Sequence, residues 1–178
     1  MKKGYLGVDV GSVSTNMVVM DEDGEIVRSL YLRTNGQPVK TVQDGLRQLG
    51  SEIGSEMEIM GAGVTGSARN LTSVLVGADV VKNEITAHAI AVSQLVPGTQ
   101  TILEIGGQDS KIIIMRDGIV TDFAMNTVCA AGTGSFLDQQ AYRLNLPIEE
   151  FGALALKAST PVRIAGRCAV FAESDMVH

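Results

Sequence analysis

A pattern of three strands that occurs twice is the feature that most constrains this chain of 178 residues. The stretch GVDVGSVSTNMVVMDEDGEIVRSLYL predicts an apolar strand, a Gly/Ser turn, a second strand, an acidic glycine turn and a third strand. The stretch TILEIGGQDSKIIIMRDGIVTDFAM predicts the same order, and aligning Gly11 with Gly106 places Asp9 on Glu104. We interpret the two stretches as an internal duplication, with two unrelated hairpins as the alternative.

Helical segments are expected between and after the two copies. Apolar residues at helical spacing, together with Pro147 at one helix start, predict helices over residues 38–53, 83–96, 132–144 and 147–158. The stretch EIMGAGV predicts a short strand over residues 58–64. The turn residues Pro97 to Thr99 mark a boundary between two halves. This order of elements predicts an α/β protein with mixed sheets flanked by helices.

Charge and hydropathy exclude several classes of partner. The formal net charge is −6 with both signs interspersed, so we expect no nucleic acid and no membrane surface as partner. The apolar run at the N-terminus is broken by Asp9 and Gly11, which does not fit a signal peptide, and no segment is long enough to span a bilayer. We therefore expect a cytoplasmic protein, in which a disulfide between the two cysteines is disfavoured.

Each copy carries a turn suited to phosphate. In the first turn Gly11 lets the backbone approach a ligand, and hydroxyl and amide donors come from Ser12, Ser14 and Thr15. Asp9 would repel a phosphate, so its expected role is to hold Mg²⁺, directly or through water. The second turn offers the corresponding glycines, donors and acids, namely Glu104, Gly106, Gly107, Gln108, Asp109, Ser110 and Lys111. Two such turns would clamp a polyphosphate, whereas either alone is ordinary hairpin chemistry.

The two cysteines lie in similar surroundings. Cys129 in CAAGTGSFL and Cys168 in GRCAVFAES each come shortly before an expected helix start. The positive end of a helix favours a thiolate. The residues alone leave open buried packing thiols, a redox pair and part of a metal site.

These motifs together resemble a known family. GVDVGSVSTN, GAGVTGS and EIGGQDSK resemble the phosphate-binding elements of the actin, sugar kinase and seventy-kilodalton heat-shock chaperone superfamily. Within it, NEITAHA, IGGQDSK, CAAGTGSFLD and CAVFAES are similar, in the same order, to the ATPase activators of 2-hydroxyacyl-CoA dehydratases and benzoyl-CoA reductases. The resemblance implies two ribonuclease H-like lobes, residues 1–97 and 98–178, the second of them incomplete because the family continues beyond His178.

The resemblance also implies a function. It implies a homodimer that hydrolyses ATP to ADP with Mg²⁺, shares one 4Fe-4S cluster, and passes low-potential electrons from a donor such as ferredoxin or flavodoxin to an iron-sulfur dehydratase or reductase. Four thiolates are the usual complement of such a cluster, so Cys129 and Cys168 from each of two subunits would hold it.

Further positions follow from the resemblance. Glu84 would act with Asp9 and Glu104 in catalysis, and Glu104 stands where the family usually has Asp. The nucleotide-binding set would also include Gly132, Thr133 and Gly134. Two other functions stay open: a small-molecule kinase of the N-acetylhexosamine type, which needs no cluster, and a regulatory or interaction fragment without catalysis.

Overall fold

The computed structural model describes residues 2–126, 133–166 and 168–177. The chain forms two compact units, Met1–Thr99 and Gln100–His178, and each is described by itself. The sequence places the boundary two residues earlier, after residue 97. Among the described residues, no helix has the length and apolar character needed to cross a membrane.

The first unit is built on a five-stranded sheet of order β3-β2-β1-β4-β5. Its strands are β1 (Lys2–Val10), β2 (Ser14–Asp21), β3 (Ile26–Arg33), β4 (Met57–Thr65) and β5 (Val80–Val81). β1 pairs antiparallel with β2 and parallel with β4, so it lies in the middle of the sheet. The end of β1 that carries Asp9 therefore has a neighbouring strand on each side.

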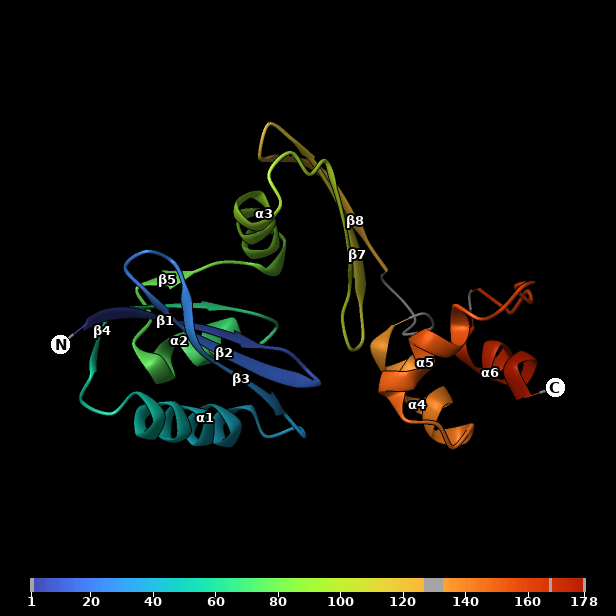
Figure 1. Ribbon diagram of the computed structural model, residues 1–178, viewed down its shortest axis with the longest axis horizontal. Coiled ribbons are helices and arrows are strands. Elements are labelled where there is room, and N and C mark those ends of the chain that lie inside the picture. Colours follow the sequence, from blue (N-terminus) through green and yellow to red (C-terminus); the bar gives the residue numbers. More distant parts are fainter. Residues whose placement is uncertain (1, 127–132, 167, 178) are drawn as a thin grey trace. The chain divides into compact units, whose positions relative to one another are not determined.

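Two helices cover one face of this sheet (Figure 1). α1 (Pro38–Ile53) packs on β2 and β3, and α2 (Arg69–Val76) packs on β1 and β4, while α3 (Glu84–Leu95) follows β5. The core between helices and sheet is apolar and consists of Val8, Val10, Met17, Val19, Val42, Leu49, Met57 and Val64. Burial of these side chains is the main force that fixes the end of β1 relative to β4 and α2.

The helix expected over 38–53 is confirmed, and the one expected over 83–96 is one residue shorter at each end. Neither α2 nor β5 was predicted. The sequence of α2, RNLTSVLV, is rich in β-branched residues, which do not favour a helix. The helix forms because the Ala68 amide docks on the Val10 carbonyl at 3.0 Å and Gly77 ends it in the left-handed conformation.

In its described residues, the second unit has a three-stranded antiparallel sheet of order β6-β7-β8 and three helices (Figure 1). The strands are β6 (Thr101–Ile105), β7 (Ser110–Arg116) and β8 (Ile119–Met125). The helices are α4 (Gly134–Arg143), α5 (Ile148–Ala155) and α6 (Ala169–Val177), and α4 contacts both of the others. The predicted helices over 132–144 and 147–158 correspond to α4 and α5.

The two sheets repeat the same antiparallel three-strand unit, β1-β2-β3 and β6-β7-β8. A register shift in the pairing lies between Val19 and Met20 in β2 and between Ile114 and Met115 in β7. These positions coincide when Gly11 is aligned with Gly106. A bulge at one matched position in both copies supports an internal duplication over two unrelated hairpins.

Candidate functional site

The turn between β1 and β2 is closed by the Gly11 amide, which donates to the Ser14 carbonyl at 2.9 Å. Thr34, directly after β3, supports this turn at two points. Its amide donates to the Val13 carbonyl at 2.9 Å, and its hydroxyl donates to the Gly11 carbonyl at 3.1 Å. One buried residue thus fixes the path of the backbone through the predicted phosphate turn.

Thr15 contributes to the same support. Its side chain is fully buried, and its hydroxyl lies 3.0 Å from that of Thr34. Because the Thr34 hydroxyl has one hydrogen and gives it to Gly11, Thr15 is the donor of this pair. The Thr15 hydroxyl therefore has a partner inside the protein, and Thr15 lies in β2 between its register partners Val10 on β1 and Leu32 on β3. Ser12 is exposed and Ser14 is half-buried.

Asp9 is held from two sides at the end of β1. Asn16, its partner across the β1–β2 pair, donates from Nδ2 to Asp9 Oδ2 at 3.3 Å. On the other side, the turn after β4 approaches so closely that a β-carbon on Gly66 would lie 2.5 Å from Asp9 Oδ1. Gly66 also has φ +93, which an L side chain rarely adopts. The absence of a side chain at Gly66 therefore makes room for the Asp9 carboxylate.

The second turn is closed like the first, with the Gly106 amide donating to the Asp109 carbonyl at 2.8 Å. Its acids are bridged by a buried lysine. Lys111 Nζ lies 3.0 Å from Glu104 Oε2 and 2.8 Å from Asp109 Oδ1, and the lysine side chain is 4% exposed. A buried ammonium needs such partners, because desolvation without them is costly. In this structure Lys111 therefore binds both acids of the second turn.

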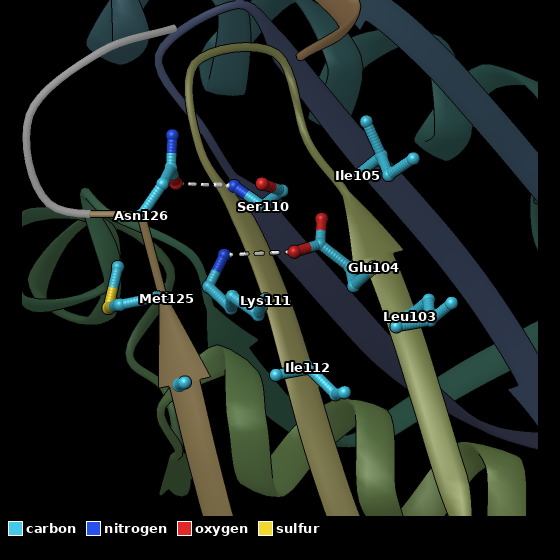
Figure 2. Close-up of a pocket in the computed structure, with 9 residues that line it drawn as sticks. Leu103, Glu104, Ile105, Ser110, Lys111, Ile112, Met125 and Asn126 are labelled. Carbon is cyan, nitrogen blue, oxygen red and sulfur yellow. Dashed lines mark hydrogen bonds and ion pairs between the residues drawn. The ribbon is translucent and has the colours of Figure 1, made fainter. Parts of the chain in front are cut away.

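A cavity of about 420 Å³ opens beside this ion-pair cluster (Figure 2). Figure 2 shows Lys111 directed toward Glu104, with apolar residues Leu103 and Ile112 further along the strands. Asn126, at the end of β8, accepts from the Ser110 amide at 2.7 Å through its side chain, and its own amide donates to the Ser110 carbonyl at 3.1 Å. The backbone of Ser110 is thus occupied, while Gln108 is exposed.

Helix α4 begins directly on the second turn. The amides of Gly134 and Ser135 donate to the carbonyls of Gly106 and Gly107 at 2.8 and 2.9 Å. A β-carbon on Gly134 would lie 3.1 Å from the Gly106 carbonyl oxygen, so the contact needs a glycine or a small adjustment. Thr133, just before the helix, is fully buried. The amide of Gly134, predicted to bind nucleotide, is therefore already used to join α4 to the turn.

Cys168 lies immediately before α6, and its carbonyl accepts from the Ala172 amide at 2.9 Å. Its side chain is half-buried. α6 is tied to α4 by an ion pair of 2.6 Å between Arg143 and Glu173. Cys168 thus occupies the helix start that the sequence predicted for it.

Cys129 and Gly132, which the sequence also assigns to the site, lie outside the described residues. Glu84 is the first residue of α3 and is partly exposed, following Asn83, which caps the helix by accepting from the Thr86 amide at 2.8 Å. Within the described part of the chain, no three His, Cys, Asp or Glu side chains gather as a metal-binding cluster.

Sequence reasoning missed Thr34, Asn16 and Asn126. Each is a small polar residue next to a strand, a place where such residues are common for turn formation alone. A signal existed only for Asn126, which ends the second repeat directly before the cysteine motif.

Residues 6–178 match the BadF/BadG/BcrA/BcrD ATPase family. The chain belongs to this family. The (R)-2-hydroxyglutaryl-CoA dehydratase activating ATPase of Acidaminococcus fermentans is 34% identical over 175 residues, which are 97% of this chain and 65% of that protein. The activator of lactoyl-CoA dehydratase of Anaerotignum propionicum is 36% identical over 174 residues, 97% of this chain and 66% of that protein. The resemblance inferred from the four motifs is thereby confirmed.

A solved structure agrees with this membership of the BadF/BadG/BcrA/BcrD ATPase family. The activator of the 2-hydroxyisocaproyl-CoA dehydratase from Clostridium difficile, solved with bound ADPNP, superposes with a TM-score of 0.82 at 32% identity. The match covers 98% of this chain and 64% of that chain. The duplicated α/β fold of the actin-like ATPases, expected from the sequence, is confirmed. The chain spans about 65% of the length of the curated relatives it matches.

Proposed function

We propose that the protein containing this chain is an ATP-hydrolysing iron-sulfur activator, which transfers low-potential electrons to a dehydratase or reductase of the 2-hydroxyacyl-CoA or benzoyl-CoA type. The observation that carries the proposal is the family match over residues 6–178, with relatives named as dehydratase activators aligned along 97% of the chain. One electron passes from a donor such as ferredoxin or flavodoxin to the partner enzyme while ATP is converted to ADP and phosphate.

The nucleotide side of the proposal rests on the two glycine turns. The backbone amides of the first turn other than that of Gly11, together with those around Gln108, are the groups proposed to bind phosphate. The neighbouring polar atoms are already bonded inside the protein to Thr34, Asn126 and Lys111. Asp9 would hold the water shell of Mg²⁺, and its carboxylate is already fixed by Asn16. The Lys111 ammonium partly neutralises Glu104 and Asp109, which lowers the repulsion that a polyphosphate would meet at the second turn.

The cluster side rests on the chemistry of the donor set. This chain has two cysteines, and two copies of it would supply the four thiolates that a 4Fe-4S cluster requires. Cys168 lies half-buried directly before α6, at the helix start expected for a cluster ligand. When bound, the cluster supplies a one-electron redox centre.

The experiment that tests the cluster is iron analysis of the full-length protein, purified and reconstituted without oxygen, together with sizing. One cluster shared by two subunits gives about two iron atoms per chain in a dimer. Cys129→Ser or Cys168→Ser removes two of the four ligands at once, so either variant should contain almost no iron. A colourless monomer with both thiols open to titration would favour the kinase alternative.

The ATPase is tested separately with Asp9→Ala. Loss of the metal-positioning carboxylate should slow ATP hydrolysis by about a hundredfold or more, because metal and water positioning supply several kcal/mol of transition-state stabilisation. Iron content and dimer size should remain at the wild-type values. Hydrolysis at the wild-type rate would contradict the role of Asp9 and leave the cluster assignment standing.

A further inference from the structure

A buried hydroxyl at the end of β4 lacks a partner. Among the described residues, Thr65 Oγ1 is one of two buried side-chain polar atoms that form no hydrogen bond, the other being Gln140 Nε2. An unsatisfied buried hydroxyl costs about 1–3 kcal/mol, and a valine of nearly the same shape would avoid that cost. Folding of the first unit therefore gives no reason for a hydroxyl at this position.

Thr65 belongs to a polar row at the candidate site. Asp9 is the register partner of Asn16 on β2 and of Thr65 on β4, so the three residues lie side by side across three strands. Asp9 lies between buried Val8 and Val10, Asn16 lies between buried Thr15 and Met17, and buried Val64 precedes Thr65. Because side chains alternate along a strand, the row faces away from α1 and α2.

Of the two side chains that flank Asp9 in this row, that of Asn16 is hydrogen-bonded to Asp9 and that of Thr65 is not. Asn16 donates to Asp9 Oδ2 at 3.3 Å, whereas the Thr65 hydroxyl on the other side of Asp9 makes no such contact. Neighbouring strands lie about 4.8 Å apart, and two hydrogen bonds through one water molecule span about that distance. The turn after β4 cannot swing away to hydrate this hydroxyl freely, since Ala68 anchors it to the Val10 carbonyl at 3.0 Å.

We propose that Thr65 is a further binding residue of the magnesium–phosphate site, where its Oγ1 hydrogen-bonds a water molecule of the Mg²⁺ shell beside Asp9. This inference rests on the proposed function, because it takes Asp9 as the residue that faces the metal. The ligand class is a magnesium-bound nucleoside polyphosphate. The hydroxyl supplies one hydrogen bond in the bound state and stays unsatisfied without ligand.

The proposal predicts that one variant, Thr65→Val, is at least as stable as the wild type without ligand but binds the nucleotide analogue more weakly. Thr65→Val removes an unsatisfied group from the unliganded protein, so its urea midpoint should equal or exceed the wild-type midpoint. The same variant should bind the magnesium complex of a non-hydrolysable ATP analogue about tenfold more weakly, which corresponds to one hydrogen bond. Thr65→Ser keeps the hydroxyl and should retain wild-type affinity.

The test is calorimetric titration of the full-length protein with the analogue, with Mg²⁺ and with EDTA, alongside urea unfolding without nucleotide. Equal affinity of wild type and Thr65→Val would overturn the inference, as would an equal loss in EDTA, since the water shell would then play no part. A fall in the urea midpoint of Thr65→Val would show a structural partner for the hydroxyl and also overturn it. A wild-type protein that does not bind the analogue at all would instead overturn the proposed function.

Discussion

Replacing Thr34 by valine tests how the first phosphate turn is held in place. Thr34 is 2% exposed, and its hydroxyl is the centre of a relay from Thr15 to the Gly11 carbonyl. The substitution keeps the shape of the side chain but removes both hydrogen bonds. The Thr15 hydroxyl and the Gly11 carbonyl are then left without this partner, and each such group costs about 1–3 kcal/mol when it stays buried. We expect a loss of about 2 kcal/mol or more.

Thr15→Val is the matched comparison. It removes one hydrogen bond, but Thr34 still donates to Gly11, so the expected loss is about 1 kcal/mol. The double variant should lose less than the sum of the two single variants, because it no longer leaves the Thr15 hydroxyl orphaned. The predicted order of destabilisation thus follows from the direction of the relay.

Amide hydrogen exchange measured on peptides of the full-length protein is the suitable assay, since the chain has two units and a single unfolding free energy is not defined for both. A loss of about 2 kcal/mol in local opening free energy speeds exchange in β1 and β2 by about thirtyfold. Peptides from β6 to β8 serve as the internal control and should not change. Unchanged exchange in Thr34→Val, or a larger effect of Thr15→Val, would refute the relay.

Two further predictions concern the neighbours of the site. Gly66→Ala places a β-carbon 2.5 Å from Asp9 Oδ1 and from the Val10 carbonyl, so it should lower the local opening free energy measured by hydrogen exchange in β1 and β4 by about 3 kcal/mol or more. Gly24→Ala has a similar φ of +86 but nothing within 4 Å, so it should cost only the backbone strain of about 1 kcal/mol in the same assay. Equal losses would mean that the close approach does not matter. Arg143→Met removes the half-exposed ion pair between α4 and α6, and in a cluster-free Cys129→Ser background it should speed thiol labelling of Cys168 by up to about fivefold. Labelling at the same rate as in the Cys129→Ser parent would show that the ion pair does not hold α6.

The fold was predictable where local pattern and tertiary packing agree. The hairpins follow from alternating strands with glycine turns, and α1 follows from its apolar stripe and its proline at the first turn. α2 was missed because its eight residues favour a strand locally, and the contacts that make it a helix come from β1 and β4. Tertiary packing overrides propensity in such a short segment.

The site was predictable in part for the same reason. The glycines and the Asp9 position stand within one local motif, whereas the support from Thr34 to Gly11 crosses 23 residues. The sequence assigned Lys111 to phosphate, but Glu104 is its direct register partner across the β6–β7 pair, so the ammonium meets a carboxylate first. Strand register decides such pairings, and a motif alone does not reveal it.

The contact between α4 and the second turn also closes a loop in the chain. Backbone hydrogen bonds join Gly134 and Ser135 to the carbonyls of Gly106 and Gly107. The segment from residue 107 to residue 134, which includes β7 and β8, therefore has its two ends fixed together. The entropy of closing such a loop grows only slowly with its length. The β7–β8 turn at Asp117 and Gly118, both at positive φ, is therefore a place where a peptide tag can be inserted while the ends of the loop stay joined.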